Sequence, residues 1–452
     1  MDPKLLLAIL VGKTANAILT LTGGGGTAAP GLFALKIDPN LVKKLSKKIK
    51  KGSIVISGTN GKTTASRILF DIVSAHHKVL HNRQGSNLLR GVASTFIKNC
   101  SITGNLEYDL GIWETDEAAL PEIISQTSPN TIILLNLFRD QLDRYGEVEA
   151  VREKWAKAIL ILPQNARLIL NADDPHVSFV GKSFKGKPIY FGVEDKKLNL
   201  PVVENVADVR FCLNCGHKLN YDPIFSAHLG HWSCPKCPYK RNAPQISASS
   251  LKFSPDLSTK LRLSVNRQQL TVNYSLPGLY NVYNVLAAAL AARALKIDPE
   301  TIISSIRNFK PAFGRFQKLN LYGKKAVIFL IKNPAGANEI IRTIAPLKNT
   351  HLLTILNDNI ADGRDVSWIW DTNWEVLKDK FINAVTSGTR AYDMALRLKY
   401  AGMSNIDTHE DINTSLKMSL DEMKTKDTLL ILPTYTAMLE LQKILGGKWH
   451  EN

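Results

Sequence analysis

Short apolar runs alternate with segments of helical spacing along much of the chain. The runs Ser53–Ile56, Thr131–Leu135 and Arg167–Leu170 are typical of buried parallel strands. Ala65–Val73 and Val282–Leu295 carry apolar residues at helical spacing and predict helices. Alternation of this kind predicts an α/β fold, a doubly wound parallel sheet with helices on both faces.

The same pattern divides the chain into parts. We expect residues 1–50 to be helical or irregular, residues 51–320 to form a central domain, and residues 210–241 to be an insertion within it. Residues 321–452 predict a second, Rossmann-like α/β domain. Its strands are expected near Ala326–Ile331, Leu352–Leu356, Ile382–Val385 and Thr428–Leu432.

Composition adds limits to this picture. A chain of 452 residues with 44% hydrophobic and 21% charged residues is typical of a soluble globular protein of about three domains. No unbroken apolar run reaches the length of a membrane span. The net charge of +17 comes from dispersed residues, with no basic and aromatic stripe of the kind that binds nucleic acid. An anionic membrane surface therefore fits the charge better than nucleic acid does.

The segment from position 58 to 64 carries the first candidate chemistry, because it follows an apolar strand and precedes a helix. Backbone N–H groups at a helix N-terminus, together with Lys62, would bind the phosphates of ATP, and the Thr63 hydroxyl would ligate Mg²⁺. Ile56 stands where the usual pattern has its first glycine, so the loop is a shortened P-loop. An ordinary glycine-rich turn is the alternative. The segment consists of Gly58, Thr59, Asn60, Gly61, Lys62, Thr63 and Thr64.

Four of the five cysteines form two C-x-x-C pairs, Cys212 with Cys215 and Cys234 with Cys237. Two such knuckles, eighteen residues apart, are the pattern of a zinc ribbon, in which four thiolates complete a tetrahedron around Zn²⁺. Disulfides are the alternative, but a chain with few other cysteines and no secretion signal favours a metal. Four thiolates leave no open coordination position, so the predicted role is structural.

Polar residues follow several predicted strands, at the edge of the sheet where ligands gather. Glu114 ends the strand-like run from Leu110 and is the predicted carboxylate ligand of Mg²⁺, which requires oxygen donors. The adjacent Asp116 and Glu117 suit the capping of the next helix better. In the C-terminal part, the loop 356–365 is dense in acids and amides, as functional loops often are.

These motifs occur in the order seen in Mur ligases, which activate a carboxylate as an acyl phosphate and join an amine to it. The chain resembles more closely the MurT family, the ligase subunits of lipid II isoglutaminyl synthase. This resemblance covers essentially the whole chain. It rests on the P-loop, Glu114, the four-cysteine insertion and the segments 139–141, 171–175, 278–284, 314–315, 332–338 and 358–371.

The resemblance implies an activity and its cofactors. MurT-like enzymes use ATP and Mg²⁺ to convert the α-carboxylate of D-glutamate in the lipid II stem peptide to an amide, in peptidoglycan synthesis. It implies catalytic roles for Lys62, Glu114 and Asp365, and a place in the cytoplasm, with contact to the inner face of the cell membrane as an option. By resemblance, the nucleotide would also be contacted by Asn171, Asp174, Asn281, Asn284 and Arg315.

Ammonia must come from elsewhere, since none of the five cysteines has the strand–helix setting of a glutaminase nucleophile. The family's partner is a GatD-type glutaminase, and Asp365 matches the residue that would orient the catalytic histidine of that partner. Asp358 and Asp362 are alternatives for this role. Two other functions stay open: an amide ligase similar to folylpolyglutamate synthase, and a non-catalytic zinc-ribbon module that binds nucleotides.

Overall fold

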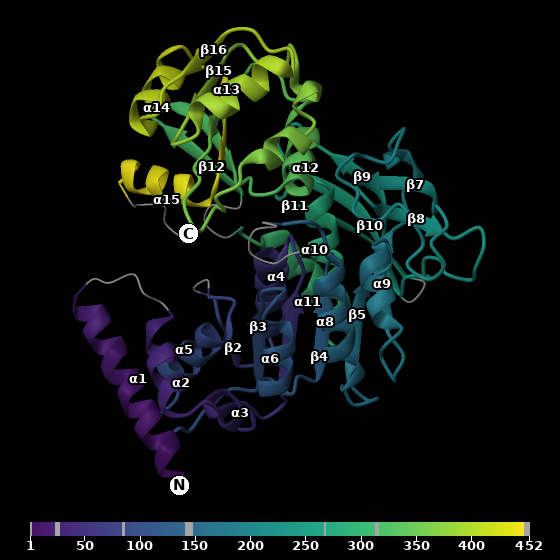
Figure 1. The fold of residues 1–452 in the computed structure, drawn as a ribbon, viewed down its shortest axis with the longest axis vertical. Helices are drawn as coiled ribbons and strands as arrows, with labels where there is room; N and C mark the ends of the chain where they lie inside the picture. The colour runs from purple at the N-terminus through teal and green to yellow at the C-terminus, as the bar shows by residue number, and fades with distance from the viewer. Residues whose placement is uncertain are drawn as a thin grey trace.

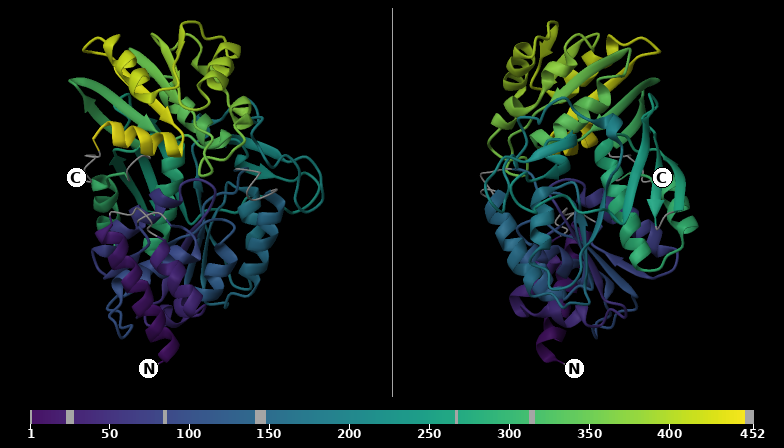
Figure 2. Two further views of the ribbon diagram at one scale, coloured as in Figure 1. Left: turned by 60° about the vertical axis from the view of Figure 1, so that its left-hand side comes forward. Right: turned by 90° about the vertical axis from the view of Figure 1, so that its right-hand side faces the viewer.

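The chain folds around two large sheets and one small one. In a computed structural model, residues 2–22, 28–83, 86–140, 148–265, 268–311 and 316–446 are described. A nine-stranded sheet forms the lower part of the molecule with the N-terminal helices, and a six-stranded sheet lies above it (Figure 1). The side views of Figure 2 show the same arrangement, with the N-terminus at the end far from the six-stranded sheet. The predicted α/β class is confirmed.

The central sheet has the strand order β11-β10-β9-β6-β5-β4-β1-β3-β2. The seven strands β2, β3, β1, β4, β5, β6 and β9, in that spatial order, run parallel to one another. Strands β10 and β11 extend the sheet beyond β9 as antiparallel strands. The strands are β1 (Ser53–Ser57), β2 (Val79–His81), β3 (Leu110–Glu114), β4 (Thr131–Leu134), β5 (Arg167–Asn171), β6 (Ile189–Val193), β9 (Ile246–Phe253), β10 (Thr259–Val265) and β11 (Gln268–Tyr274).

Helices cover both faces of this sheet, as the sequence predicts. Ile54 and Ile56 of β1 belong to the core on one face, and Val55 belongs to the core on the other, because successive side chains of a strand alternate. The first face is covered by α4 (Lys62–Ser74), α10 (Leu279–Ala294) and α11 (Pro299–Asn308). The second face is covered by α5 (Leu89–Asn99), α6 (Leu120–Thr127), α8 (Val148–Leu160) and α9 (Pro175–Gly181).

Three helices precede the central sheet: α1 (Pro3–Leu21), α2 (Ala29–Ile37) and α3 (Leu41–Ser46). They join the core of the second face through apolar residues such as Ile9 and Leu41. Among the described residues, α1 is the one helix long and apolar enough to cross a membrane, by length and composition alone, and most of its residues are not buried. Lys4 and Lys13 interrupt this helix, so it contains no unbroken apolar run of membrane-spanning length. A core helix or a signal sequence passes the same test.

The insertion between β6 and β9 has a small sheet of its own. Strands β7 (Asn220–Ser226) and β8 (Leu229–Ser233) pair antiparallel and are separate from the central sheet, and a short helix η1 (Lys196–Leu198) precedes them. The Trp232 indole N–H donates to the carbonyl of Ala172 at 3.1 Å, which ties the insertion to the end of β5. Its core consists of Val209, Cys212, Leu219, Trp232 and Tyr239.

The second large sheet has the order β12-β13-β17-β14-β15-β16, in which β12 alone is antiparallel. The four predicted strands are observed within a few residues of their expected limits. The domain limits stay a prediction, and β12 begins before residue 321. The strands are β12 (Phe316–Leu321), β13 (Lys324–Phe329), β14 (Thr350–Ile355), β15 (Ala384–Ser387), β16 (Ile406–Thr408) and β17 (Thr428–Pro433); the helices are α12 (Pro334–Ile344), η2 (Ser367–Asp371), η3 (Trp374–Leu377), α13 (Ala391–Tyr400), α14 (Ile412–Asp421) and α15 (Tyr435–Ile444).

Candidate active site between the two large sheets

The loop from β1 to α4 has the geometry of an anion-binding turn. Gly61 precedes the first residue of α4 and has φ = 89°, a left-handed conformation that favours glycine. A Cβ added there would lie 2.0 Å from Oδ1 of Asn284, so a larger residue would also collide with α10. Gly61 therefore fixes both the turn and the close approach of α10. The first N–H groups of α4 and the positive end of its dipole follow directly.

Neighbouring strand ends hold this loop in place. The Asn60 N–H donates to Oδ1 of Asn136 at 2.8 Å, and the Asn136 amide donates back to the Asn60 carbonyl at 3.0 Å. The Thr59 hydroxyl, almost fully buried, accepts from the N–H of Phe138 at 2.9 Å. Gly58 has φ = 147°, and its added Cβ would lie 2.9 Å from the side chain of Leu135. The loop is rigidly connected to the residues after β4.

Lys62 is folded back onto its own loop. Its ammonium donates to the Gly58 carbonyl at 2.5 Å and the Thr59 carbonyl at 3.1 Å, and it pairs with Oε2 of Glu117 at 2.7 Å. Burial alone would lower the pKa of Lys62, but the carboxylates of Glu117 and Asp116 outweigh burial and hold the pKa above its usual value. Lys62 is therefore cationic, and Glu117 is an ion-pair partner rather than only a residue near a helix start.

Two oxygen donors converge where the sequence predicts a metal site. The Thr63 hydroxyl lies 2.9 Å from Oε1 of Glu114, which ends β3. Asn82 holds the backbone of Glu114 on both sides, since its Oδ1 accepts the Glu114 N–H at 2.9 Å and its amide donates to the Glu114 carbonyl at 2.8 Å. A hydroxyl and a carboxylate at this separation suit one hard cation such as Mg²⁺.

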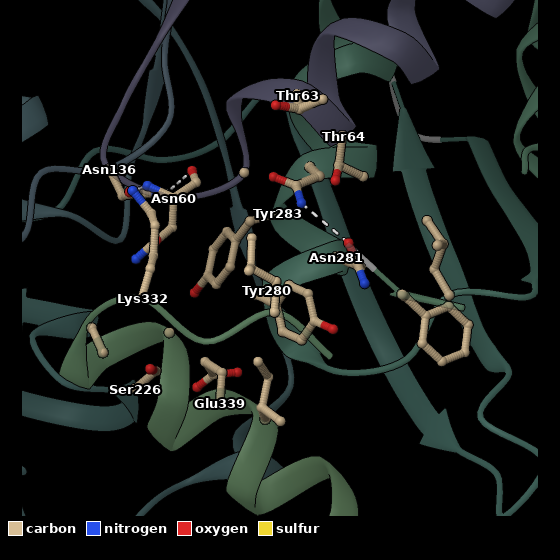
Figure 3. Close-up of a pocket in the computed structure, with 18 of the residues that line it drawn as sticks. Asn60, Thr63, Thr64, Asn136, Ser226, Tyr280, Asn281, Tyr283, Lys332 and Glu339 are labelled. Carbon is tan, nitrogen blue, oxygen red and sulfur yellow. Dashed lines mark hydrogen bonds between the residues drawn. The ribbon is translucent and has the colours of Figure 1, made fainter. Parts of the chain in front are cut away.

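A cavity opens from the start of α4 toward the six-stranded sheet, and Figure 3 shows its lining. Its walls come from places far apart in the sequence, among them the P-loop and α4, the first turns of α10, and the segment from the end of β13 into α12. Tyr280, Tyr283, Phe316 and Ile340 supply apolar surface beside the polar groups. The polar lining residues are Asn60, Thr63, Thr64, Asn136, Ser226, Asn281, Asn284, Lys332 and Glu339.

The predicted nucleotide contacts separate into two groups. Asn281 and Asn284 line the cavity and are joined by a hydrogen bond of 3.2 Å. Asn171 and Asp174 are fully buried: the Asn171 amide donates to the Leu135 carbonyl at 3.0 Å, and Asp174 caps α9. In this structure they shape loops behind the cavity, and their contact with a nucleotide stays a prediction. The prediction for Arg315 lies outside the described residues.

The C-terminal sheet contacts the P-loop directly. The Asn333 amide donates to Oδ1 of Asn60 at 3.0 Å, while its own Oδ1 accepts the Gly336 N–H as the N-cap of α12. The adjacent Lys332 pairs with Oδ2 of Asp140 at 2.6 Å. Burial would raise the pKa of Asp140, but Lys332 overrides it and holds the pKa below its usual range. The sequence marked Lys332 and Asn333 as a motif without assigning them a role in this contact.

The three candidate aspartates of the loop after β14 differ in what they bind. Asp362 is buried and accepts the Thr436 N–H at 2.8 Å, and Asp358 lies 3.4 Å from the Arg390 guanidinium. Asp365 is exposed and accepts the Ser367 N–H at 2.8 Å through Oδ1. Hydrogen bonds from Ser367 hold the pKa of Asp365 below its usual range, so its carboxylate is ionised at neutral pH. Asp365 is thus the best placed of the three to meet another protein.

The four predicted zinc ligands come together in the insertion. The sulfur atoms of Cys212 and Cys237 lie 3.5 Å apart and those of Cys215 and Cys234 lie 3.4 Å apart, and all four lie within 4.8 Å of one another. A tetrahedron with Zn–S bonds of about 2.3 Å places sulfurs about 3.8 Å apart, so the cluster fits this geometry. Of the histidines nearby, His217 lies with Nδ1 3.7 Å from the sulfur of Cys215, whereas His228 is buried beside Asp174 and His231 contacts the Val193 carbonyl.

Comparison with known proteins agrees with this organisation. The family model of the Mur ligase middle domain matches residues 56–292, which contain the P-loop, Glu114 and the four cysteines. The family model of the MurT ligase C-terminal region matches residues 330–438, which contain Lys332 and Asp365. The two models therefore reach both large sheets, while β12 and β13 lie between the matched ranges.

Relatives and solved structures extend the comparison to nearly the whole chain. The chain is 33% identical over 443 residues to subunit MurT of lipid II isoglutaminyl synthase (glutamine-hydrolyzing) from Staphylococcus aureus, covering 97% of each chain. It is 32% identical to the subunit of the same name from Streptococcus pneumoniae, covering 99% of this chain and 98% of the relative.

Solved structures share the fold at lower identity. A pseudomurein peptide ligase type C from Methanothermus fervidus superposes with a TM-score of 0.69 and 23% identity, covering 89% of this chain and 80% of the other. MurF ligase from Thermotoga maritima in complex with ADP superposes with a TM-score of 0.66 and 13% identity, covering 91% of this chain and 83% of the other. With two MurT relatives matched over nearly their full length, the chain belongs to the MurT family of Mur ligases.

Proposed function

We propose that this protein is the ligase subunit that amidates the α-carboxylate of D-glutamate in the lipid II stem peptide, using ATP and ammonia from a GatD-type glutaminase. The observation that carries the proposal is the full-length similarity to MurT subunits combined with a P-loop, a hydroxyl–carboxylate pair and an exposed aspartate in one chain. The product would be D-isoglutamine in a peptidoglycan precursor.

The ligase step has a clear physical requirement. A carboxylate is a poor electrophile, and transfer of the γ-phosphoryl group of ATP to one of its oxygens creates an acyl phosphate with a good leaving group. Mg²⁺ supplies positive charge to the phosphates when bound, and Thr63 and Glu114 would hold it. Lys62 and the N-terminus of α4 would offset the charge that develops on the transferred group. Lys62 would leave the carbonyls of its own loop to do so.

The cavity supplies the rest of the nucleotide site in this proposal. Asn281 and Asn284 would hold the base and ribose, and Tyr280 offers apolar surface for the base. Ammonia would then attack the acyl carbon; phosphate leaves and the nitrogen loses a proton, which completes the amide. Lys332 and Asn333 bring the C-terminal sheet over this site, so the two sheets together would keep water away from the acyl phosphate.

Ammonia delivery would depend on the partner subunit. Asp365 would accept a hydrogen bond from the partner's catalytic histidine, fix its tautomer and stabilise its cation. Five residues further along the chain, Trp370 is 48% exposed and its ring lies 5.5 Å from the ring of Tyr400. Tyr392, Leu396 and Tyr400 form an exposed stripe along α13, spaced four residues apart. This aromatic surface suits a protein interface, and Tyr400→Asp should weaken co-purification of the glutaminase.

The four-cysteine cluster is proposed to hold one structural Zn²⁺. The N–H groups of Asn214 and Lys236 point at the sulfurs of Cys212 and Cys234, both at 3.4 Å, as in thiolate knuckles. The insertion carries this cluster beside α9, and Arg241 joins it to Asp173 of the central domain at 2.6 Å. The metal would thus stabilise the insertion, which packs against the central domain, and would take no part in the reaction.

Contact with the membrane is proposed to occur through α1 and α2. Leu7, Leu10, Ile18 and Leu21 form one stripe of α1, and Leu21 is 86% exposed. Leu32 and Phe33 of α2 are also exposed. A positively charged protein with an exposed apolar stripe suits an anionic bilayer surface, which is where a lipid-linked substrate resides. Ile18→Asp should reduce sedimentation with anionic vesicles, and unchanged sedimentation would refute this surface.

The proposal is tested by incubating the purified protein with lipid II, ATP, Mg²⁺ and ammonium chloride. Mass analysis of the stem peptide should show the D-glutamate carboxyl replaced by a carboxamide, with one ADP formed per amide. Lys62→Ala should abolish the product. A stem peptide left unchanged by the wild-type protein under these conditions would refute the proposed function.

A further inference from the structure

A second cavity, of about 350 Å³, lies between the end of β2 and α5. It is separate from the nucleotide cavity and nothing in the ATP-dependent chemistry uses it. Figure 1 shows β2, α5 and α2 together in the N-terminal half of the molecule. The cavity is lined by His81, Asn82, Arg83, Ser86, Gly91, Ser94, Thr95, Lys98 and Asn99.

The cavity begins beside the candidate metal site. Asn82, which lines its inner end, is 3% exposed and holds both backbone groups of Glu114. The carbonyl of Asn87 accepts the N–H of Asp116 at 2.9 Å, which fastens the start of α5 to the same strand end. From Gly91 to Asn99 the lining follows α5 for about 12 Å, at a rise of 1.5 Å per residue. An extended ligand in this cavity would have one end next to the site of phosphoryl transfer.

The other side of the cavity adjoins the N-terminal helices. The Gly31 N–H of α2 donates to the hydroxyl of Ser94 at 2.8 Å, and the Lys13 ammonium of α1 donates to the Ile97 carbonyl at 3.0 Å. The exposed apolar residues Leu32 and Phe33 follow Gly31 directly. A ligand in the cavity would therefore lie between the reaction centre and the proposed membrane-facing helices.

The charge of the lining selects the class of ligand. Arg83 and Lys98 are exposed at its mouth, while Asn82 and Ser94 are buried and polar. Among the described residues that line the cavity there is no carboxylate. Arg67 adds positive charge near His81. Asp71, outside the lining, is the acid that lies near Arg67 and Arg83. Cationic and hydrogen-bonding groups without a lining acid favour a phosphate or carboxylate oxyanion.

His81 is the polar group on the wall that no described residue satisfies. Both ring nitrogens are buried without a hydrogen-bond partner in the described part of the chain, and the ring stacks on Phe70 at 5.4 Å. Burial, with Arg67 and Arg83 nearby, lowers the pKa of His81 to about 3. Its ring is therefore neutral at pH 7 and can donate one hydrogen bond to a ligand. A bound anion would also offset the positive charge of Arg67 and Arg83.

We propose that this cavity binds an oxyanion of the lipid-linked acyl substrate and so directs the carboxylate to the phosphoryl-transfer site. The proposal rests on the proposed function for the identity of the substrate. Two oxyanions of that substrate have the required chemistry, the carboxylates of its stem peptide and the diphosphate of its lipid headgroup. In either case Arg83 and Lys98 would act in substrate binding and not in nucleotide binding.

Titration and kinetics of the full chain test this proposal. Proton–carbon NMR of the labelled histidine rings, with His81 assigned from its loss in His81→Gln, would follow additions of inorganic diphosphate or of a soluble muramyl peptide that contains D-glutamate. We expect the His81 signal to shift with at least one probe. Arg83→Gln and Lys98→Gln should each raise KM for lipid II roughly tenfold or more, since a charge-assisted hydrogen bond is lost, and leave KM for ATP unchanged. Arg90→Gln is the matched control, because Arg90 is an exposed arginine of α5 outside the cavity lining.

The outcomes distinguish the two candidate oxyanions, and they distinguish failure of the cavity proposal from failure of the proposed function. A shift with diphosphate alone assigns the cavity to the headgroup, and a shift with the peptide alone assigns it to the stem peptide. No shift with either probe, with KM for lipid II unchanged in both variants of an active enzyme, would overturn the cavity proposal alone. Absence of amidation by the wild-type enzyme would overturn the proposed function, while the NMR titration would still decide whether the cavity binds an oxyanion.

Discussion

Asp365→Asn should separate the use of glutamine from the ligase reaction. The Ser367 N–H bonds to Oδ1 of Asp365 at 2.8 Å, and an asparagine oxygen can keep this bond, so the loop should hold its shape. The second oxygen becomes an NH₂ group, which would donate toward the partner's histidine where an acceptor is required. In catalytic triads the same exchange favours the wrong tautomer and lowers turnover about 10⁴-fold, or about 5 kcal/mol.

The assay compares two nitrogen sources with the reconstituted complex. With glutamine, amidation of lipid II should fall by a factor on the order of 10³ to 10⁴. With ammonium chloride it should stay within about twofold of the wild-type rate, because Asp365 lies outside the lining of the nucleotide cavity. Asp371→Asn, at an exposed position six residues further along, is the matched control. Unchanged glutamine-dependent turnover, or an equal loss with both nitrogen sources, would refute the assigned role of Asp365.

Three further outcomes follow from the metal sites and a buried histidine. Glu114→Gln should lower turnover about 100-fold or more and raise the Mg²⁺ concentration for half-maximal rate, and an unchanged Mg²⁺ dependence would count against this ligand. Cys215→Ser should release zinc, measured by metal analysis, and open the ribbon to proteolysis between residues 212 and 237, whereas the buried Cys100→Ser should do neither. Burial, with His228 nearby, lowers the pKa of His176 to about 3 in the folded protein. As pH falls below about 6.5, the imidazole of His176 therefore becomes protonated in the unfolded chain while it stays neutral in the folded one. This histidine should therefore lower the free energy of unfolding by about 2 kcal/mol between pH 7.5 and pH 5, measured by urea unfolding. His176→Gln should flatten that pH dependence.

The sequence predicted best where the relevant residues are neighbours along the chain. Gly61 and Lys62 lie in one loop between a strand and a helix, and each cysteine pair spans four residues, so local pattern was sufficient to predict their geometry. Several parallel strands of both sheets were predicted for the same reason, since buried strands such as β1 and β4 are short uninterrupted apolar runs.

Several contacts between distant segments were not predicted. Lys332 and Asn333 meet Asp140 and Asn60 only because one sheet lies over the edge of the other, and no local pattern carries that placement. Glu117 was assigned to helix capping because its pairing with Lys62 depends on how β3 is placed beside β1. Strands β9 to β11 were missed individually because their residues alternate between buried and exposed, which gives no continuous apolar run.

Transfer of oxygen from the substrate to phosphate tests most directly whether this chain activates a carboxylate. Lipid II labelled with oxygen-18 in the D-glutamate α-carboxylate would be incubated with the purified protein, Mg²⁺, ATP and ammonium. An acyl phosphate that is displaced by ammonia must leave one substrate oxygen on phosphate, so one oxygen-18 atom per amide should appear in the inorganic phosphate. Phosphate free of the label, in a reaction that forms the amide, would contradict phosphorylation of the carboxylate.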